Sequence, residues 1–190
     1  MLQAAKIFQD GMILQREKPV AVWGTGEPGE KVHAEIQGEN AETTIDEFGK
    51  WELNLLPLET SAEETLVIKT EKESITFHQV AVGEVWLAGG QSNMEFYMRY
   101  EKHIEETKPV CENTRVRFFD VPEIAFDGQL EDFDYSRMGI WRKATKEDIE
   151  YFSAVGYYFQ KEIGKALDVV PPQLQPTIPT GTSNTFSISF

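Results

Sequence analysis

The sequence predicts a mixed fold in which an antiparallel β-sandwich is followed by an α/β domain with a parallel sheet. Three observations support this. Residues 1–81 contain short alternations of apolar and polar residues separated by turns, residues 82–90 form a mostly apolar run that ends in two glycines, and residues 152–167 carry the clearest helical periodicity. Since strands repeat every two residues and helices every 3.6, the change of pattern near residue 81 predicts a boundary between a domain at 1–81 and one at 82–169.

The alternation in the first domain is clearest over residues 31–37 and 51–55. Val32, Ala34 and Ile36 alternate with polar residues, which a sheet with one face on a core and the other in water requires. Further strands are expected at residues 12–15, 20–23, 43–45, 66–68 and 75–80. Asp-Glu-Phe-Gly at residues 46–49 predicts a hairpin turn, because glycine readily adopts a positive φ. Short strands at this spacing are typical of a small sandwich.

A glycine motif in the same region invites a different interpretation. Residues 24–29, Gly-Thr-Gly-Glu-Pro-Gly, match the G-x-G-x-x-G pattern of dinucleotide-binding proteins. That pattern must open a helix, whereas this one contains Pro28 and runs into the predicted strand at 31–37. We therefore interpret these residues as a turn.

Charge and composition argue against several functional classes. The chain has 18 Lys and Arg against 32 Asp and Glu, and its net charge of -14 repels phosphate backbones and anionic lipids. We therefore expect no nucleic-acid partner and no membrane partner. Residues 1–10 hold no apolar run of signal-peptide length, so the chain as written is expected in the cytoplasm. The single cysteine, Cys111, is expected to be a small buried apolar residue. The sequence leaves the oligomeric state open.

The second domain is predicted to begin with a buried strand at 82–90. A helix from 93 to about 107 and a strand at 115–119 follow. The acidic loop at 127–134 does not have the spacing of an EF-hand, so no metal is expected there. The segment 170–190 is rich in proline and uncharged, and it is predicted to be disordered.

The densest chemical signal is the segment 89–95, Gly-Gly-Gln-Ser-Asn-Met-Glu. A sharp turn between a strand and a helix presents a hydroxyl to open space, and free N–H groups there can stabilise an oxyanion. Ser92 is thus a candidate nucleophile, with Gly90, Gln91 and Asn93 forming its turn. Ser92 and Glu95 also fit a capping box, in which the hydroxyl only caps the following helix. The residues alone leave both interpretations open.

Residues 84–95, Glu-Val-Trp-Leu-Ala-Gly-Gly-Gln-Ser-Asn-Met-Glu, resemble the first conserved block of the sialate O-acetylesterase family of SGNH-type hydrolases. The resemblance extends to residues 7–16, 19–24 and 152–159, and it covers about residues 5–169. It implies an SGNH-like α/β domain and an esterase in which Ser92 attacks an O-acetyl ester on a sugar through an acyl-enzyme. The N–H of Ser92 would be one oxyanion donor. The resemblance implies neither a metal nor an organic cofactor.

The same family has motifs that this sequence lacks. Its second block ends in Gly-Gly-Thr, its third supplies an Asn, and a late Asp-x-x-His provides the general base; none is intact here. The three histidines, His33, His78 and His103, are expected to be exposed or capping residues rather than the base. Gly181 lies near the spacing of the second block and is the candidate remnant of a second oxyanion donor.

These departures predict a chain that is truncated or frameshifted after the first catalytic block. A proline-rich segment stands where the resemblance implies a further buried strand. We expect such a chain to be weakly active or inactive by itself, because a serine hydroxyl is a poor nucleophile without a base. We also expect an unpaired sheet edge and poor solubility.

The alternative function is a non-catalytic carbohydrate-binding or structural module, in which the sandwich is the functional part and Ser92 is only a helix cap. The exposure of Trp23, Trp51 and Trp86 bears on this alternative. An exposed coplanar pair would favour stacking on sugar rings, and burial of all three would argue against it. Packing in the core is the expectation for each.

Overall fold

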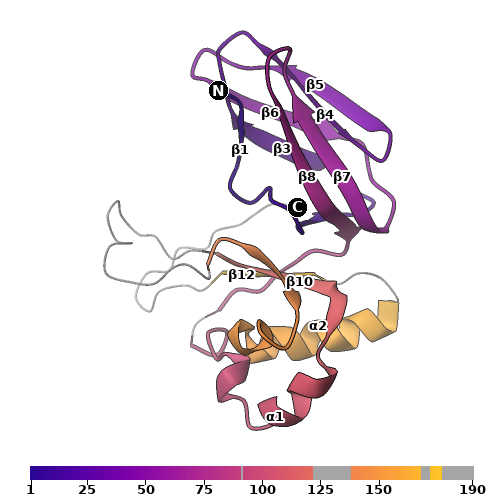
Figure 1. Cartoon of the computed structure of the whole chain (residues 1–190), viewed down its shortest axis with the longest axis vertical. Helices are drawn as coiled ribbons and strands as arrows, with labels where there is room; N and C mark the ends of the chain where they lie inside the picture. Colours follow the sequence, from indigo (N-terminus) through magenta and orange to yellow (C-terminus); the bar gives the residue numbers. More distant parts are fainter. Residues whose placement is uncertain (91, 122–137, 168–171, 177–190) are drawn as a thin grey trace. The chain divides into compact units, whose positions relative to one another are not determined.

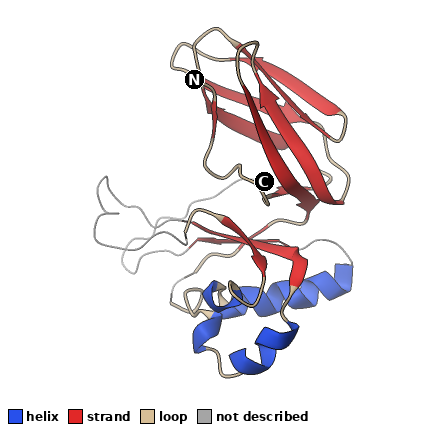
Figure 2. Ribbon diagram, viewed as in Figure 1, coloured by secondary structure: helices blue, strands red, loops and turns tan. Residues whose placement is uncertain are grey.

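The computed structural model describes residues 1–90, 92–121, 138–167 and 172–176. The chain divides into two compact units, Met1–Glu84 (unit 1) and Val85–Phe190 (unit 2). Among the described residues, unit 1 contains strands and no helix, whereas unit 2 combines strands with all of the helices (Figures 1 and 2). The described residues are mostly strands with few helices, in agreement with the predicted mixed fold.

Unit 1 consists of two sheets (Figure 2). The three-stranded sheet has the order β1-β3-β6, with β1 at Gln3–Ala4, β3 at Val20–Thr25 and β6 at Lys50–Leu55. The five-stranded sheet has the order β2-β8-β7-β4-β5, with β2 at Ile13–Gln15, β8 at Ser74–Gly83, β7 at Ser61–Lys69, β4 at Lys31–Ile36 and β5 at Glu39–Thr44. Neighbouring strands are antiparallel except β2 and β8, which run parallel.

The alternation predicted for residues 31–37 and 51–55 is confirmed by burial. On β4, the side chains of Val32, Ala34 and Ile36 are at most 1% exposed, and the residues between them are not buried. On β6, Leu53 and Leu55 point to the core in the same way. Burying an aliphatic side chain of this size contributes roughly 1.5–3 kcal/mol, so these faces hold unit 1 together.

The predictions for two turns of unit 1 differ in their outcome. Residues 46–49 do turn, with Gly49 at φ 76° and the Asp46 carboxylate accepting the N–H of Phe48 at 2.9 Å. The turn, however, carries the chain from β5 in one sheet to β6 in the other, so the hairpin prediction is wrong. The residues of the turn determine that the chain reverses direction here. Which sheet the next strand joins depends instead on burying the apolar faces of the two sheets. The glycine motif at 24–29 starts inside β3, with Gly24 and Thr25 paired to β6, and the expected turn lies at Pro28 and Gly29 before β4.

Unit 2 is built on a four-stranded sheet of order β11-β10-β12-β9. Its strands are β9 at Trp86–Leu87, β10 at Asn113–Val121, β11 at Trp141–Ala144 and β12 at Pro172–Pro176. The strands β9, β12 and β10 are parallel, and β11 pairs antiparallel with β10 at one edge. The described residues contain the helices α1 at Ile104–Thr107 and α2 at Ala154–Leu167 and the 3-10 helices η1 at Met98–Tyr100, η2 at Lys108–Val110 and η4 at Ile149–Tyr151.

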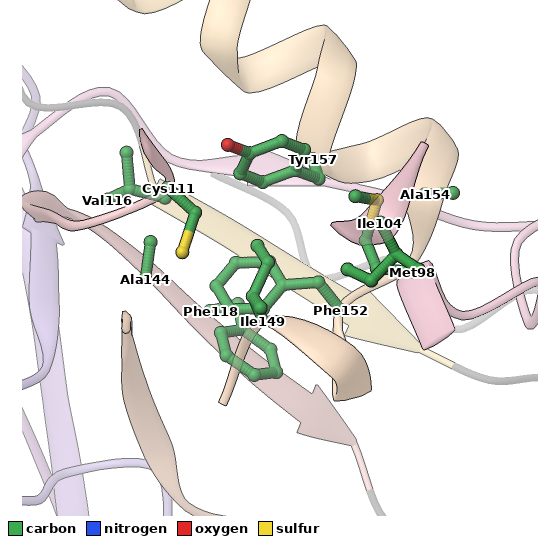
Figure 3. Close-up of a cluster of buried hydrophobic side chains, with 10 residues drawn as sticks. All are labelled: Met98, Ile104, Cys111, Val116, Phe118, Ala144, Ile149, Phe152, Ala154 and Tyr157. Carbon is green, nitrogen blue, oxygen red and sulfur yellow. The ribbon is translucent and has the colours of Figure 1, made fainter. Parts of the chain in front are cut away.

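Helix α2 lies between β11 and β12 in the chain and packs on the sheet through one apolar cluster (Figure 3). Phe118 of β10 and Phe152, just before α2, are at most 1% exposed, and their ring centroids lie 3.5 Å apart. Cys111 lies in the same cluster, is a free thiol and is 2% exposed, which confirms its prediction as a buried apolar residue. The other members of the cluster are Met98, Ile104, Val116, Ala144, Ile149, Ala154 and Tyr157.

Strand β12 corrects part of the prediction for residues 170–190. Pro172–Pro176, expected to be disordered, lie between β10 and β9 as a parallel strand. The two prolines occupy the ends of the strand, so the residues between them supply the N–H groups that a ladder needs. The unpaired edge that we expected at this position is therefore filled. Residues 177–190, which include Gly181, lie outside the described residues.

The segment expected to be a helix from 93 to about 107 is broken instead. It contains a turn at 92–94, an isolated bridge between Tyr97 and Ser153, and the short helices η1 and α1. The N–H of Met98 donates to the oxygen of Phe152 at 2.8 Å, and the N–H of Ala154 donates to the oxygen of Phe96 at 2.8 Å. These contacts with a distant segment override the local helical tendency.

Two other predictions in unit 2 need adjustment. The strand expected at 82–90 is divided, because Val82 and Gly83 end β8 of unit 1 and only Trp86–Leu87 form β9; Trp86 is 38% exposed rather than buried. The helix over 152–167 is confirmed as α2. Its inner face, however, carries Tyr157 and Gln160, whereas Val155 and Phe159 of the expected apolar face are 51% and 44% exposed.

Candidate functional site

Ser92 follows the carboxyl end of β9 in the chain, and β9 is the outermost strand of the described unit 2 sheet. Because β9, β12 and β10 run parallel, their carboxyl ends meet at the same edge. Ligand sites of open α/β sheets lie at this edge, since the loops there are free to diverge around a ligand. The described residues thus contain the strand and the turn that the sequence predicts around the nucleophile. The helix predicted to follow directly from residue 93 is not formed.

The side chain of Ser92 is accessible. Ser92 and Asn93 are both exposed, and Ser92 begins the turn at 92–94. Within the described part of the chain, the Ser92 hydroxyl forms no hydrogen bond. No helix begins at this residue, because the next helical residues are those of η1 at Met98. The capping-box interpretation of Ser92 is therefore wrong.

Gly90 lies where little space is left for a side chain. A Cβ on Gly90 would come within 2.6 Å of Cγ of Met94, whereas a Cβ on Gly89 would meet nothing within 4 Å. The turn thus folds the chain at Met94 back over Gly90, with Ser92 at its tip. Gln91 lies outside the described residues, as does Gly181, so two of the predicted site residues have no described position.

The segment that follows Ser92 is held against the start of α2. The Tyr97–Ser153 bridge joins the two, and Met98 is fully buried in the core beneath them. Ser153 caps α2, because its hydroxyl accepts the N–H of Gly156 at 3.2 Å. The amino terminus of a 14-residue helix therefore lies beside the segment that carries the candidate nucleophile.

None of the three histidines has contacts that make it a base for Ser92. His103 precedes α1, is about half exposed and lies 3.4 Å from a carboxylate oxygen of Glu106. His33 faces Glu42 on the five-stranded sheet of unit 1, at 3.4 Å. His78 is exposed on β8, also in unit 1. Of the three histidines, expected to be exposed or capping, His78 and His103 are exposed, His33 is half-buried, and His103 forms no cap hydrogen bond on α1.

Sequence reasoning missed an arginine near this segment. The Arg99 guanidinium carbon lies 4.8 Å from the ring centre of Tyr97, 4.9 Å from that of Tyr100 and 5.5 Å from that of Tyr151. Stacking of a guanidinium on aromatic rings leaves its N–H edges free to donate. The pattern Tyr-x-Arg-Tyr at 97–100 was the available signal, but Tyr151 joins the group only through the fold.

The three tryptophans have different environments. Trp51 is 3% exposed, Trp23 is 40% exposed and Trp86 is 38% exposed. Trp86 packs edge-on against Phe159 in unit 2, at a centroid distance of 5.4 Å. The expectation of core packing therefore holds for Trp51 and fails for the other two. Trp23 and Trp51 of unit 1 do not form an exposed pair.

The described residues contain no group of three or more acidic, cysteine or histidine side chains that could hold a metal ion. The acidic loop at 127–134 lies outside them. A search of the described helices for a long apolar span finds none that could cross a membrane.

Comparison with known proteins finds similar relatives, whereas no family model matches the sequence. Human sialate O-acetylesterase is 28% identical over 177 residues, which cover 84% of this chain and 34% of the relative. Mouse sialate O-acetylesterase is 30% identical over 176 residues, or 82% of this chain and 32% of the relative. The crystal structure of a carbohydrate acetylesterase from Xanthomonas citri superimposes with a TM-score of 0.82 and 26% identity, over 93% of this chain and 40% of that one.

The region of similarity includes both described units. The chain spans about a third of the length of the curated relatives that it matches. The resemblance predicted from the segment around Ser92 is confirmed, and over most of its length this chain is similar to the sialate O-acetylesterase family.

Proposed function

We propose that this chain carries the nucleophile of a carbohydrate O-acetylesterase, and that Ser92 is that nucleophile. The observation that carries the proposal is an exposed serine without a hydrogen bond to any described residue, at the carboxyl edge of three parallel strands. The similarity to sialate O-acetylesterases and to a carbohydrate acetylesterase supports the substrate class, an O-acetylated sugar. We further propose a β-sandwich for unit 1 and the first part of an SGNH-like domain for unit 2.

In the proposed reaction, the Ser92 oxygen attacks the acetyl carbonyl carbon and its proton passes to a base. The carbonyl π electrons move onto oxygen, and N–H groups of the turn around Gly90, Gln91 and Asn93 are the proposed oxyanion donors. Collapse of the tetrahedral intermediate breaks the bond to the sugar oxygen, which takes up the proton. Water then attacks the acetyl-serine ester, releases acetate and restores Ser92.

The proposal limits what this chain does by itself. Serine needs a base to remove its proton, and His103, the histidine of unit 2, lies 3.4 Å from Glu106 on α1. Enzymes that lose such a base keep only a small part of their rate, about 10³–10⁴-fold over water. We therefore propose slow turnover for this chain and reaction of Ser92 with strong electrophiles.

A serine-directed fluorophosphonate tests the proposal directly. After incubation of the chain, peptide mass spectrometry should locate the adduct on Ser92, and Ser92→Ala should abolish it. Acetate release from O-acetylated sialic acid and from acetylated xylan should show the same dependence on Ser92. Ser74→Ala is the matched control, because Ser74 is an exposed serine on β8 of unit 1.

Three results would each contradict the proposal. The first is an adduct on another residue, and the second is labelling that survives Ser92→Ala. The third is the absence of both labelling and acetate release in a chain whose circular dichroism shows that it is folded.

A further inference from the structure

The outer face of the three-stranded sheet in unit 1 carries an open cavity of about 660 Å³. Its lining includes the exposed residues Trp23, Thr25, Lys50 and Glu52 and the buried Trp51. In the sheet, Trp23 lies opposite Glu52, and Thr25 lies between Gln3 and Lys50. The aromatic side chain of Trp23 thus lies among polar side chains on the surface of the sheet. The volume falls in the range of small-molecule sites.

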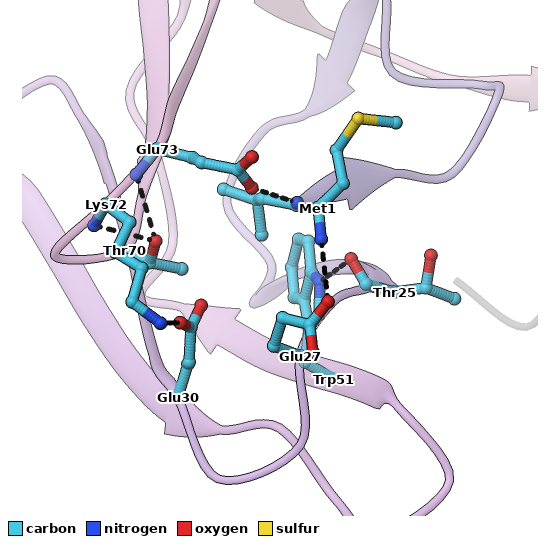
Figure 4. Close-up of polar contacts among 9 residues, drawn as sticks. Met1, Thr25, Glu27, Glu30, Trp51, Thr70, Lys72 and Glu73 are labelled. Carbon is cyan, nitrogen blue, oxygen red and sulfur yellow. Dashed lines mark hydrogen bonds and ion pairs between the residues drawn. The ribbon is translucent and has the colours of Figure 1, made fainter.

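Trp23 is held in place although it is 40% exposed. Its ring packs edge-on against the buried Phe8, with centroids 4.9 Å apart and planes at 77°. Strand β1, which pairs with β3, follows two residues that contact other parts of unit 1. The Met1 amino group lies 3.2 Å from Glu27, and the N–H of Leu2 donates to Glu73 (Figure 4). An aromatic ring fixed before binding loses little conformational entropy when a ligand stacks on it.

The floor of the cavity is rigid for a separate reason. The indole N–H of Trp51 donates to the oxygen of Thr25 at 3.1 Å, which ties β6 to β3 (Figure 4). Gly24 makes room for this ring, because a Cβ there would lie 2.7 Å from Cζ2 of Trp51 and 2.0 Å from the oxygen of Gln3. Trp51 is thus a buried and hydrogen-bonded part of the cavity lining, beside the exposed ring of Trp23.

Of the polar side chains that line this cavity, Asp46 accepts the N–H groups of Phe48 and Lys50, whereas others have no partner within the described part of the chain. Among the described residues, the side chains of Gln3, Thr25, Lys50 and Glu52 form no hydrogen bond or ion pair. The five-stranded sheet differs, because there Glu42 pairs with Lys31 at 3.1 Å and faces His33 at 3.4 Å. The cavity thus places unpaired hydrogen-bond donors and acceptors beside an aromatic ring. The positive charges of Lys6 and Lys50 in its lining equal in number the negative charges of Asp46 and Glu52.

We propose that this face of unit 1 is a binding site for a neutral oligosaccharide. A pyranose ring has an apolar face of C–H groups that stacks on an indole and a rim of hydroxyls that both donate and accept hydrogen bonds. Trp23 provides the stacking surface, and the amide, hydroxyl, ammonium and carboxylate groups around it satisfy the hydroxyls. The balanced charge favours an uncharged sugar over a polyanion. The site lies in unit 1, whereas Ser92 lies in unit 2, so the binding does not depend on the proposed esterase.

Isothermal titration of the full chain with xylotetraose, cellotetraose and mannotetraose tests the proposal. At least one of these probes should bind, and Trp23→Ala should weaken its binding about tenfold or more, the loss expected when an aromatic stacking surface is removed. Lys50→Ala combined with Glu52→Ala removes only exposed polar groups, and it should also weaken binding. This second variant keeps the test valid if the loss of Trp23 disturbs the packing of Phe8.

Phe48→Ala is the matched control, because Phe48 is 78% exposed on the adjacent turn and does not line the cavity. It should leave the affinity unchanged, as should Ser92→Ala, which separates this proposal from the esterase. Three outcomes would overturn the proposal: no binding of the three probes at millimolar concentration, equal binding by the wild type and both cavity variants, or binding of polygalacturonate alone. A change of sedimentation with Trp23→Ala but no sugar binding would assign the face to protein contacts instead.

Discussion

Replacing Phe152 by alanine tests the packing that holds the segment behind Ser92. The ring of Phe152 is fully buried, touches Phe118 of β10 and is surrounded by Met98 and Ile149, which are also fully buried. Its backbone oxygen accepts the N–H of Met98 at 2.8 Å. A cavity of this kind collapses only partly, so Phe152→Ala should cost about 3–5 kcal/mol of stability. Since 1.4 kcal/mol is about a tenfold change, protection against hydrogen exchange should fall by roughly 10²–10³-fold or more.

Hydrogen–deuterium exchange followed by mass spectrometry measures this loss in each unit separately. Peptides from β10 and α2 should lose protection, and peptides from β4 and β7 in unit 1 serve as the internal reference. Phe48→Ala is the matched control, because the same change at a side chain that is 78% exposed should stay within about 0.5 kcal/mol. A loss below about 1 kcal/mol in unit 2, or an equal loss in both units, would refute the assigned packing.

Three further predictions concern single residues. Ser153→Ala removes the cap of α2 and should lower the stability of unit 2 by about 1 kcal/mol in urea titration; no change would exclude a capping role. Burial raises the pKa of Glu84, but the hydrogen bonds from Arg16 and Gln15 outweigh it and the net pKa is lowered. The ionised Glu84 carboxylate should therefore stabilise unit 1 above about pH 4.5, and this stabilisation should be lost as the pH falls through the lowered pKa. Arg16→Gln removes the ion pair, so the Tm of the variant should depend less on pH in the acid range. Burial also raises the pKa of the Cys111 thiol, so it should react with Ellman's reagent at pH 8 only when unit 2 opens; immediate reaction in the native protein would contradict its burial.

The parts of the fold that the sequence predicts well are those set by local periodicity. The alternation at Val32, Ala34 and Ile36 identifies β4, because it reflects one buried face. The apolar spacing after Ser153 identifies the helix α2 but not its buried face, since Val155 and Phe159 are exposed. The buried position of Cys111 follows from residue type in the same way. Ser92 was found by its motif, and its exposed position on a turn agrees with the predicted role, which stays a proposal.

The errors lie where distant segments compete with local preference. Residues 93–107 have helical character, but pairing of Phe96–Met98 with Phe152–Ala154 gains backbone hydrogen bonds and buries Met98, so the helix is broken. The turn at 46–49 has the residues of a hairpin, yet it connects two sheets. The proline-rich segment lacks any strand pattern, and Pro172–Pro176 are ordered by the two parallel strands that flank them.

The sequence alone determined the division into a strand-rich part and an α/β part, the family resemblance and the identity of the candidate nucleophile, because these depend on residue type and short spacing. Only the tertiary structure decided that the Ser92 hydroxyl is not a helix cap, that Arg99 lies against three tyrosine rings and that Trp23 is exposed while Trp51 is buried. The physical reason is that exposure and side-chain partners are properties of packed surfaces. They depend on which segments meet in space, and the order of residues along the chain does not state this.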